Sequence, residues 1–388
     1  MNGSPSRAGF AGDDKQTIAI AGGGPTGLAL ALALHRHGLR AEIFDARERH
    51  AGLADRRILA LSYGTRQTLE WLGAWEGLPA TAITNIHISH RGGLGRARLT
   101  AAEQQVPALG YVVAAADLIR TLDRAVAQLG IPIHAPHAVS DARSEGEGIR
   151  FTAGDSERTA RLLAYAEGAI ADGAELRRRD YRQHAVLCTV ATREPHHGRA
   201  WERFTPLGPV ALLPFATEMA VVYTCPDADA PALAGLDDAA FLARLQDQFG
   251  ERIHFTAVTP RSLFPLGLRY RTTAVGARQV WLGNAAQTLH PVAGQGYNLA
   301  LRDIRQLART LGAAADPGAD DTLSRYAASR SLDRNATIGF TDTLVRLFSN
   351  DHPLLGHARG AGLLALDLLP PLRRFVANRM IFGARAWP

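Results

Sequence analysis

The residues with the clearest chemical potential lie far from the N-terminus, between Gly283 and Asn298. This segment reads GNAAQTLHPVAGQGYN, and it follows an apolar run, residues 280–282, that is typical of a short buried strand. Its glycines and proline interrupt regular structure before a helix that we expect to open at Asn298. Two glycines flank Gln295 at this helix start. The first N–H groups of a helix have no intrahelical partner, and together with the helix dipole they suit an anionic ring oxygen.

A second segment, close to the N-terminus, has the pattern of a dinucleotide-binding unit. Residues 17–21 suit a buried parallel strand, and Gly22-x-Gly24-x-x-Gly27 follows immediately. Helical spacing comes next, and then another apolar run that ends at Asp45. The first glycine permits a tight turn, the second lets the backbone approach a diphosphate, and the third lets helix and strand pack closely. The acid can accept a ribose hydroxyl, so strand, helix and acid in this order disfavour a simple glycine turn.

The two segments together resemble the class A aromatic hydroxylases, the para-hydroxybenzoate hydroxylase superfamily. Residues 290–298, HPVAGQGYN, followed by Asp303, are similar to the signature of its ubiquinone-biosynthesis hydroxylases. Two positions depart from the superfamily pattern: Asn284 stands where Asp is usual, and Ala300 stands where glycine is common. The Asn form is similar to the UbiH-type branch, the 2-polyprenyl-6-methoxyphenol hydroxylases.

The resemblance implies an α/β fold with a Rossmann-like FAD-binding domain of the para-hydroxybenzoate hydroxylase type, an inserted sheet-rich substrate domain and a helical C-terminal region. It implies an FAD-dependent monooxygenase that hydroxylates a polyprenylated phenol in ubiquinone biosynthesis. In that chemistry NAD(P)H reduces FAD, O2 forms a flavin hydroperoxide, and the phenol attacks it. Two alternatives stay open: a non-hydroxylating flavoprotein reductase, and a structural flavoprotein subunit of a quinone-synthesis complex.

An arginine after the second apolar run is a further candidate for the cofactor. Residues 55–62, DRRILALS, resemble the family's Asp-x-Arg-x-x-Ala-Leu-Ser. In that match Arg57, rather than Arg56, reaches the cofactor phosphates, because a guanidinium group suits a diphosphate. Without the family spacing, a solvated basic loop would be the better interpretation.

An acidic residue and a glycine in the middle of the chain match a further family motif. In the family an Asp-Gly pair near both FAD and the nicotinamide cofactor follows a strand, and here Glu167-Gly168 follows the apolar residues 161–166. Ala171 stands where Ser is usual, which puts the nicotinamide contact in doubt. A competing alignment, which fits the strand less well, uses residues 172–173.

The resemblance also suggests catalytic residues, His290 and Pro291. The histidine is a candidate proton donor or, as is more common beside a proline, a structural residue that bonds the backbone. The proline is a candidate wall beside the ring, and the backbone from Gly294 to Asn298 is the candidate stabiliser of negative charge. The predicted cofactor-binding residues are Gly22, Gly24, Pro25, Thr26, Gly27, Asp45, Arg57, Glu167, Gly168, Gly283, Asn284, Pro291, Gly294, Gln295, Gly296, Tyr297 and Asn298.

The substrate cleft is predicted from another run that is similar to the family. Residues 202–209, ERFTPLGP, resemble the branch's Glu-Arg-Phe-x-x-x-Gly-Pro, and their aromatic side chain could hold a phenol ring. A packed turn at a domain boundary is the alternative interpretation. The predicted cleft residues are Arg203, Phe204, Leu213 and Pro214.

The motif positions imply a discontinuous FAD-binding domain, because the two flavin segments lie far apart in the chain. We expect strands at residues 185–190, 210–214 and 219–223 of the substrate domain. The predicted organisation is a flexible tail at 1–15, an FAD-binding domain at 16–75, 105–175 and 255–330, a substrate domain at 76–104 and 176–254, and a C-terminal helical region at 331–388.

Composition limits the other classes of function. The chain has 388 residues, of which 46% are hydrophobic, so disordered and collagen-like classes are excluded. Its two cysteines, Cys188 and Cys225, lack CxxC spacing and favour buried thiols in a reducing compartment, and no histidine group has metal-ligand spacing. The net charge of +6 comes without a nucleic-acid motif, so no nucleic acid partner is expected.

The C-terminal residues suggest a second possibility, contact with a membrane. No uninterrupted apolar stretch is long enough to span a bilayer, and no signal pattern precedes the first strand, so we expect a cytoplasmic protein. Apolar positions at helical spacing after residue 336 should cover the core. Because the implied substrate is lipid-soluble, we also consider peripheral contact with the inner face of the membrane, through apolar residues flanked by Arg373, Arg374 and Arg379. Expected partners are the phenol, O2 and other ubiquinone-synthesis proteins.

Overall fold

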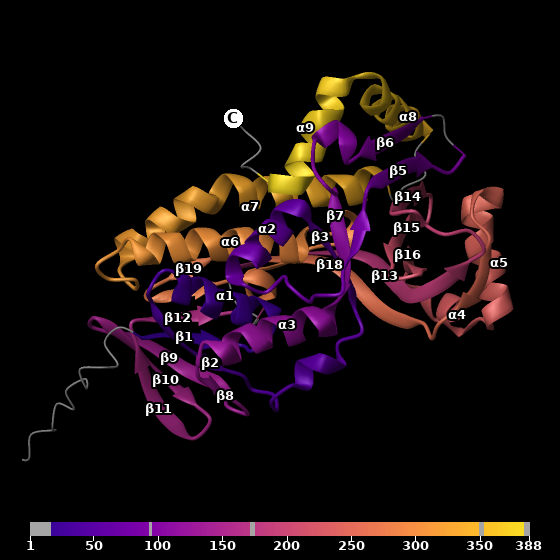
Figure 1. Ribbon diagram of the computed structural model, residues 1–388. Helices are drawn as coiled ribbons and strands as arrows, with labels where there is room; N and C mark the ends of the chain where they lie inside the picture. The colour runs from indigo at the N-terminus through magenta and orange to yellow at the C-terminus, as the bar shows by residue number, and fades with distance from the viewer. Residues whose placement is uncertain (1–16, 93–94, 171–174, 349–352, 384–388) are drawn as a thin grey trace, which may run out of the picture.

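The computed structural model describes residues 17–92, 95–170, 175–348 and 353–383 (Figure 1). The predicted tail at 1–15, and Ala171 with the alternative pair at 172–173, lie outside the described residues. Two sheets dominate the fold, with helices packed on both (Figure 1). The α/β architecture expected from the sequence is confirmed.

The first sheet, here the N-terminal sheet, has six strands among the described residues, in the order β19-β20-β12-β1-β2-β8. Its centre is parallel: β1 lies between β2 and β12, and Ile18 and Ile20 of β1 are fully buried. Short apolar runs with both faces covered are typical of such strands. The strands are β1 (Thr17–Ala21), β2 (Arg40–Phe44), β8 (Ile133–His134), β12 (Leu162–Tyr165), β19 (Val275–Gly276) and β20 (Gln279–Trp281).

Helices cover this sheet and form its core. Helix α1 is buried continuously from Thr26 to Leu34, because it lies between the sheet and neighbouring helices. A helix that is apolar on all sides needs such an enclosed position. Its neighbours include α2 (Tyr63–Leu72), α3 (Ala115–Gln128) and α6 (Gln295–Gly312), and α6 in turn contacts α7 (Asp320–Phe348). Helix α1 itself spans Pro25–Arg36.

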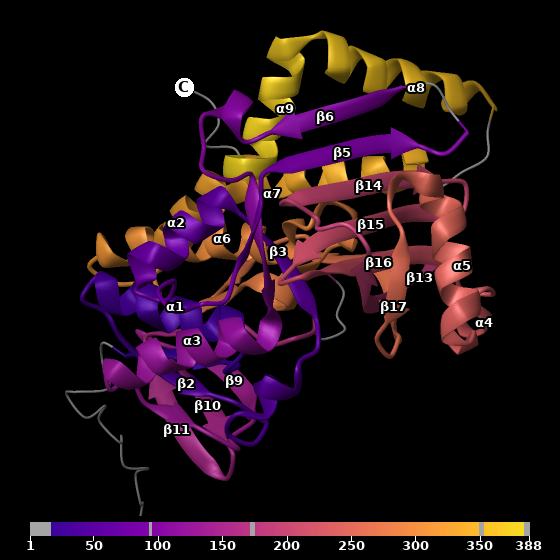
Figure 2. The same cartoon turned by 45° about the vertical axis from the view of Figure 1, so that its right-hand side comes forward.

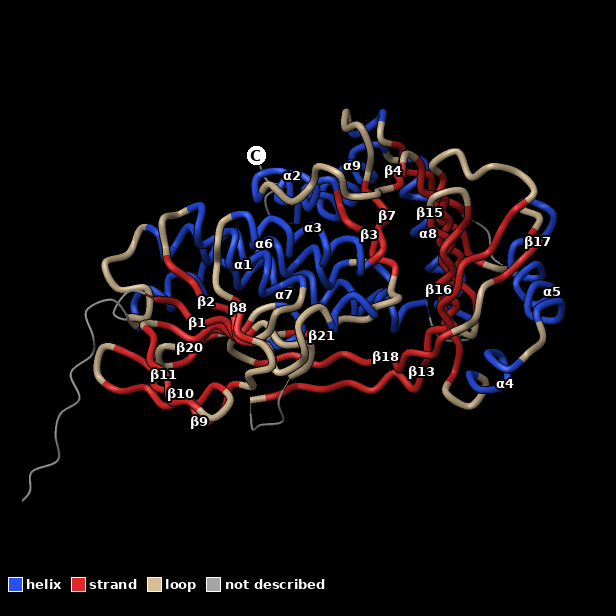
Figure 3. The backbone as a smooth tube through the Cα atoms, turned by 60° about the horizontal axis from the view of Figure 1, so that its bottom comes forward, coloured by secondary structure: helices blue, strands red, loops and turns tan. Residues whose placement is uncertain are grey.

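The second sheet, here the large sheet, has nine strands among the described residues. The order is β21-β18-β13-β16-β15-β14-β5-β6, with β17 also paired to β13, and the three predicted strands are confirmed as parts of β13, β15 and β16. Figure 3 shows the long strands β13 and β18 running from beneath the helical layer to the far end of the molecule. The strands are β5 (Asn85–His90), β6 (Arg96–Thr100), β13 (Leu176–Thr192), β14 (Arg199–Thr205), β15 (Gly208–Phe215), β16 (Glu218–Pro226), β17 (Phe255–Val258), β18 (Ser262–Arg271) and β21 (Gln287–Thr288).

Two helices, α4 (Ala230–Gly235) and α5 (Asp238–Phe249), cover one face of the large sheet. Val186, Val210 and Tyr223 of the sheet form a core with Phe241 and Leu245 of α5. The opposite face therefore remains to meet the rest of the molecule, and it carries the residues that could line a substrate site.

Two three-stranded sheets complete the described strands. One, β3-β7-β4, lies between the helical layer and the large sheet, where β4 and β7 contact β15 (Figure 3). The other, β9-β10-β11, packs on the N-terminal sheet. The strands are β3 (Ile58–Ser62), β4 (Thr81–Ile83), β7 (Gly110–Ala114), β9 (Val139–Glu145), β10 (Gly148–Ala153) and β11 (Ser156–Ala160), with short 3-10 helices at Ala51–Ala54, Ala102–Gln104 and Gly250–Arg252.

Strand pairing moves one of the predicted domain boundaries. Strands β17 and β18 lie in the range 255–330 assigned to the FAD-binding domain, yet both pair with β13 in the large sheet. Their alternating apolar residues fit a long antiparallel strand beside β13 better than a separate layer. By pairing, the large sheet takes in β17, β18 and, later in the chain, β21, and the division into domains remains a proposal.

The C-terminal helices form a hairpin beside the large sheet. Helix α8 (Pro353–Leu368) lies against β5 and β6, and α9 (Pro370–Phe382) returns to α2 (Figures 1 and 2). The packing of α9 on α2 is close: a Cβ at Gly64 would stand 2.8 Å from the carbonyl oxygen of Ile381. The helical region begins at Asp320, earlier than the predicted residue 331. Among the described residues, no helix is long and apolar enough to cross a membrane.

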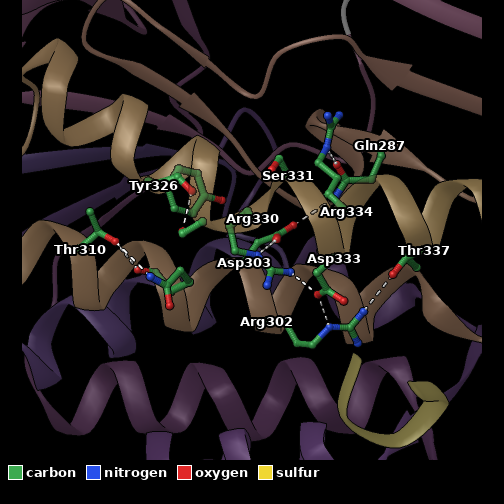
Figure 4. A network of polar contacts seen from close by, with 12 residues as sticks. Gln287, Arg302, Asp303, Thr310, Tyr326, Arg330, Ser331, Asp333, Arg334 and Thr337 are labelled. Atoms are coloured by element: carbon green, nitrogen blue, oxygen red, sulfur yellow. Dashed lines mark hydrogen bonds and ion pairs between the residues drawn. The ribbon is translucent and has the colours of Figure 1, made fainter. Parts of the chain in front are cut away.

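A buried ionic network joins α6 to α7 (Figure 4). Arg302 Nε donates to Asp333 at 2.8 Å, and Arg330 bonds both Asp333, at 2.5 Å, and Asp303, at 2.6 Å. All four side chains are at most 9% exposed. Buried charges require such mutual pairing, since an isolated ion would lose its hydration without compensation.

The same network reaches Gln287, which lies within the flavin segment at residues 283–298. Gln287 donates to Asp303 at 3.2 Å and accepts from Arg334 Nε at 2.8 Å. Arg334 also donates to the carbonyl oxygen of Arg271 at 2.6 Å. The helices α6 and α7 thereby hold the loop at residues 286–287 in place.

We predict that Asp333→Asn destabilises the fold. Although burial raises the pKa of Asp333, the charges of Arg302 and Arg330 lower it from 3.8 to about 2. A lowered carboxyl pKa gives stability that is present above pH 3.8 and is lost as pH falls towards 2. The variant should lose about 2 kcal/mol or more at pH 7 and less near pH 2.

Denaturant unfolding at several pH values measures this difference. Asp321→Asn on the same helix is the control, since the side chain of Asp321 is 74% exposed. Equal stability of the two variants at pH 7 would contradict the proposed role of the network.

Candidate functional site

Two glycines of the N-terminal loop are required by packing. Gly22 has φ of +109°, and its Cβ would lie 2.8 Å from the carbonyl oxygen of Ala166. A Cβ at Gly27 would lie only 1.9 Å from the carbonyl oxygen of Gly22. Both positions therefore exclude any side chain, and the loop turns tightly into α1.

Packing against the protein does not exclude a side chain at the remaining glycine of the motif, Gly24. Around Gly24 no protein atom stands within 4 Å of the Cβ position. Gly24 is also the N-cap of α1 and offers no side chain to the first N–H groups of the helix. Open space beside bare N–H donors and the positive end of a helix dipole suits a diphosphate.

Asp45 stands next to this loop at the end of β2. Its Oδ2 accepts from the Gly23 N–H at 2.8 Å, and its two oxygens also accept from the Arg47 side chain at 3.1 and 3.0 Å. Burial raises the pKa of Asp45, but hydrogen bonds from Arg47 and Gly23 outweigh burial and hold it below the ordinary value. The carboxylate is ionised and beside the loop, as the predicted ribose contact requires.

The flavin segment at residues 283–298 contacts the N-terminal glycine loop directly. Gly283, in the 3-10 helix η5 (Gly283–Ala285), has φ of +56°, and its Cβ would stand 2.7 Å from Thr26 Oγ1. Asn284 Nδ2 donates to the Gly168 carbonyl oxygen at 3.3 Å. The structure thus brings together all three predicted motifs around Gly22.

The pair Glu167-Gly168, predicted as the middle motif, lies beside the glycine loop. Glu167 follows directly on Ala166, whose carbonyl group contacts Gly22. Burial, and then the charge of Asp45, raise the pKa of Glu167 above its ordinary value. Glu167 therefore stands among the cofactor candidates, while the competing residues 172–173 are not among the described ones.

The start of α6 offers the other expected anion site. Gly294 is its N-cap, with φ of +58°, and no side chain caps the helix. No acidic residue occupies the first turn, and the Cβ position of Gly296 is open. The helix begins at Gln295, three residues before the predicted start at Asn298. The first N–H groups of α6 are therefore suited to stabilise a negatively charged ring.

The side chains of Tyr297 and Asn298 form their hydrogen bonds within the protein. Tyr297 Oη donates to the Pro25 carbonyl oxygen at 3.3 Å, which links the start of α6 to the start of α1. Asn298 is 2% exposed. Its Oδ1 accepts from the Ser62 N–H at 2.9 Å and from Thr65 Oγ1 at 2.7 Å. Its Nδ2 donates to the carbonyl oxygens of Ala60, at 3.1 Å, and Gly294, at 2.7 Å. Through their side chains, both residues position the site.

One ring nitrogen of His290 binds the local backbone. Its Nδ1 accepts from the Val292 N–H at 3.1 Å and caps the 3-10 helix η6 (Pro291–Ala293). The side chain is 1% exposed, and burial lowers its pKa to about 4. The ring is therefore neutral at pH 7 with its proton on Nε2, which has no hydrogen-bond partner among the described residues. Pro291 is exposed, so it is available as a wall for a ring.

Arg57 is engaged by its own loop. Its guanidinium group donates to both oxygens of Asp55, at 3.0 and 2.6 Å. A phosphate contact would require Arg57 to share or exchange this partner, and that contact stays a prediction. The neighbouring Arg56 instead lines a cavity on the open face of the large sheet.

This cavity, of about 220 Å³, lies between β3 and the large sheet. Of the four predicted cleft residues, Leu213 lines it, whereas Arg203, Phe204 and Pro214 do not. Arg203 donates to Ser89 at 3.1 Å. Ile58 and Val222 also line the cavity; they were not predicted from the sequence, although the alternation of side chains along β3 and β16 indicates which residues share a face.

Glu202 opens the motif at residues 202–209 but was not among the predicted cleft residues. Its Oε1 is buried and has no hydrogen-bond partner within the described part of the chain. Burial raises the pKa of Glu202 to about 8.

No group of three or more histidine, cysteine or acidic residues among those described could hold a metal ion, and both cysteines are buried free thiols.

Comparison with known proteins identifies the family. Residues 15–341 match the model of a family described as FAD binding domain. The chain belongs to this family. It is similar to ubiquinone hydroxylase UbiL of Rhodospirillum rubrum, with 33% identity over 93% of this chain and 88% of the relative. It is also similar to 3-demethoxyubiquinol 3-hydroxylase of Escherichia coli, with 29% identity over 92% and 96%.

Solved structures agree on the fold. The p-nitrophenol 4-monooxygenase PnpA of Pseudomonas putida superposes with a TM-score of 0.76 and 17% identity, over 96% of this chain and 99% of that one. The family and these relatives confirm the predicted FAD cofactor and the enzyme class, an FAD-dependent monooxygenase of the aromatic hydroxylase group. The roles of individual site residues remain proposals.

We predict that Gly24→Val weakens FAD binding without weakening the fold. The side chain meets no protein atom at its Cβ position, but it would fill the space proposed for the diphosphate. The dissociation constant of FAD should rise at least about tenfold, or about 1.4 kcal/mol.

Titration of the apoprotein with FAD measures the effect, and thermal melting of the apoprotein checks the fold. Gly235→Val is the matched control, because its Cβ position is also open and it lies on α4, away from the loop. Wild-type FAD affinity in Gly24→Val would place the diphosphate elsewhere.

Proposed function

We propose that this enzyme hydroxylates the aromatic ring of a polyprenylated phenol in ubiquinone biosynthesis, with NAD(P)H and O2 as co-substrates. The observation that carries the proposal is the geometry of residues 283–298: a capless helix start at Gly294 beside an exposed Pro291, joined to the glycine loop. The names of the Rhodospirillum and Escherichia relatives support the substrate class, because this chain spans most of the length of both.

The residues at hand fit FAD, since Gly24 and Gly296 leave open space beside two helix starts. When bound, FAD supplies electron transfer from NAD(P)H and the activation of O2. In the proposal the glycine loop and Arg57 hold the diphosphate, and Asp45 binds the ribose. The first N–H groups of α6 then stabilise negative charge on the ring.

The remaining residues would position the phenol and exclude water. Leu213, Val222 and Ile58 give the cavity between β3 and the large sheet apolar walls, which suit an aromatic ring. Neutral His290 holds the backbone of residues 290–292, and with it the exposed Pro291. Exclusion of water protects a reactive oxygen species from wasteful decay.

The direct test is turnover of a short-chain 2-prenyl-6-methoxyphenol by the FAD-loaded protein. We expect the phenol to stimulate NAD(P)H oxidation and to yield a product heavier by one oxygen atom, with label from ¹⁸O2, detected by mass spectrometry. NAD(P)H oxidation that yields only hydrogen peroxide, for every phenol tried, would favour the flavoprotein reductase instead.

A cavity variant localises the reaction. Val222→Phe should lower kcat/KM at least about tenfold, because the added ring occupies the substrate space, while FAD retention stays normal. Leu207→Phe, at an exposed leucine outside the cavity lining, is the control.

We also propose peripheral contact with the inner face of a membrane. Five of the large exposed apolar side chains gather on the hairpin of α8 and α9, and we name them the hairpin patch: Leu364, Leu368, Leu369, Leu372 and Phe375, each between 39% and 65% exposed. Arg374, in the same hairpin, is exposed. Apolar side chains beside an arginine suit an anionic lipid surface. Contact with other ubiquinone-synthesis proteins is a separate proposal that rests on the family resemblance.

Vesicle flotation tests the membrane contact. The wild-type chain should bind vesicles with anionic lipid. Leu368→Asp with Leu369→Asp should reduce binding at least about tenfold, since two exposed apolar side chains proposed to enter the lipid become charged. Leu332→Asp on α7 is the matched control, because Leu332 is 66% exposed but lies outside the hairpin patch. Equal losses in the two variants would contradict this surface.

A further inference from the structure

Glu202 lies on β14, on the face of the large sheet that α5 does not cover. Its neighbour Trp201 points to the other face and packs against the core that the sheet shares with α5. Glu202 pairs with Ala211 of β15, and Ala211 pairs with Val222 of β16. Because paired residues of neighbouring strands share a face, Glu202 lies in one row with Val222, a residue of the cavity proposed for the phenol.

The position of Glu202 lets its carboxyl group approach that cavity. Neighbouring strands lie about 4.8 Å apart, so the Cα atoms of Glu202 and Val222 are separated by about 10 Å. Ala211 stands between them and contributes only a methyl group to this face. The long side chain of a glutamate can lean over an alanine towards the cavity.

In the other direction, the same face leads to the start of α6. A second cavity, of about 80 Å³, is lined by Ile86 of β5 and by Gln295 of α6. Ile86 pairs with Ala200, which is the residue before Glu202 on this face of β14. Gln295 belongs to the helix start that is proposed to stabilise the flavin ring. Glu202 therefore lies between the cavity proposed for the phenol and a cavity that reaches the flavin segment.

The carboxyl group of Glu202 is not satisfied by the protein. Its Oε1 is buried without a hydrogen-bond partner in the described part of the chain, although the residue as a whole is partly exposed. The adjacent Arg203 donates to Ser89 instead. A buried polar atom without a partner is unfavourable and rare in folded proteins. The orphan oxygen therefore favours a hydrogen-bond donor supplied by a ligand at this place.

Burial also keeps the carboxyl group close to the pH at which a proton acceptor works best. Burial raises the pKa of Glu202 to about 8. The titratable groups on the elements beside this face are His90 of β5, Tyr111 of β7, and Asp342 with Arg346 of α7, and none of them is a cause of the shift. The group is therefore neutral at low pH and becomes a carboxylate as the pH passes 8. A carboxylate with a pKa this high is a stronger base than an ordinary one.

We infer that Glu202 accepts the proton of the phenol hydroxyl during ring hydroxylation. The inference rests on the proposed function and adds to it a catalytic residue. In this step the O–H bond of the bound phenol breaks and its proton passes to the carboxylate. The electron pair of that bond stays on the ring oxygen and makes the ring a better nucleophile. Once the attacked ring carbon carries its new oxygen, it loses its hydrogen to water as a proton, and Glu202 returns its own proton to the ring oxygen.

Glu202→Gln tests this role, because glutamine keeps the shape of the side chain but cannot accept the proton. With a short-chain 2-prenyl-6-methoxyphenol, the FAD-loaded variant should lose at least about 100-fold in kcat, while KM stays close to the wild-type value. In the wild-type chain kcat/KM should rise with pH up to about 8, and the variant should lack this rise. Glu194→Gln is the control, because the side chain of Glu194 is 55% exposed.

Unfolding without turnover checks that the substitution acts on a buried carboxyl group. A carboxyl pKa raised from 4.5 to about 8 gives stability that is present below pH 4.5 and is lost as the pH rises to 8. Glutamine does not ionise. Glu202→Gln should therefore gain stability relative to the wild-type chain over this pH range in denaturant unfolding, whereas a substitution that only disturbed packing would lower stability equally at every pH.

Two results would overturn the inference: wild-type kcat in Glu202→Gln, or a slow variant that keeps the wild-type rise of kcat/KM with pH. If circular dichroism shows that Glu202→Gln does not fold, Glu202→Ala with added formate decides. Recovery of kcat with formate would support the inference, and no recovery would refute it. A wild-type chain that hydroxylates no phenol would refute the proposed function itself, whereas full hydroxylation by Glu202→Gln would refute the role of Glu202 alone.

Discussion

The site depends on the four hydrogen bonds of one buried side chain, that of Asn298. Its amide joins the end of β3, through Ala60 and Ser62, to the start of α2 at Thr65 and to the N-cap of α6 at Gly294. With every donor and acceptor used inside the protein, Asn298 fixes where the N–H groups of α6 point. Those groups can stabilise a charged ring only if the helix start is held in this position before the ring binds.

Two further contacts extend this arrangement to the glycine loop. Tyr297 bonds the Pro25 carbonyl oxygen, and Gly283 lies against Thr26. The glycine loop and the flavin segment at residues 283–298, far apart in the sequence, therefore meet directly. At Gly283 the contact leaves no room for a larger residue. From behind, the network of Asp303, Arg330 and Asp333 holds α6 on α7, and Gly383 connects α9 to the same network. The flavin site and the C-terminal helix α9 therefore share one support.

Local pattern predicted most of the elements that form the site. The strand at Thr17–Ala21, the helix after it and the glycines of the loop followed from spacing, because each depends on neighbouring residues. Long-range packing decided the rest. The side chain of Asn298, a predicted cofactor residue, is engaged with β3 and α2, and its cofactor contact stays a prediction. Helix α6 starts earlier than predicted because Gly294 adopts a left-handed conformation. No local pattern could reveal that β18 pairs with β13, or that α9 closes a cavity over Leu61 and Leu99.

The measurement that tests the central claim most directly is the affinity of FAD for the Asn298→Ala chain. We expect the variant to fold, as judged by circular dichroism, but to bind FAD at least about tenfold more weakly than wild type, because the start of α6 loses its position. Asn335→Ala, at an exposed residue of α7, should bind FAD normally. Wild-type FAD affinity in Asn298→Ala would contradict the claim that this side chain organises the site.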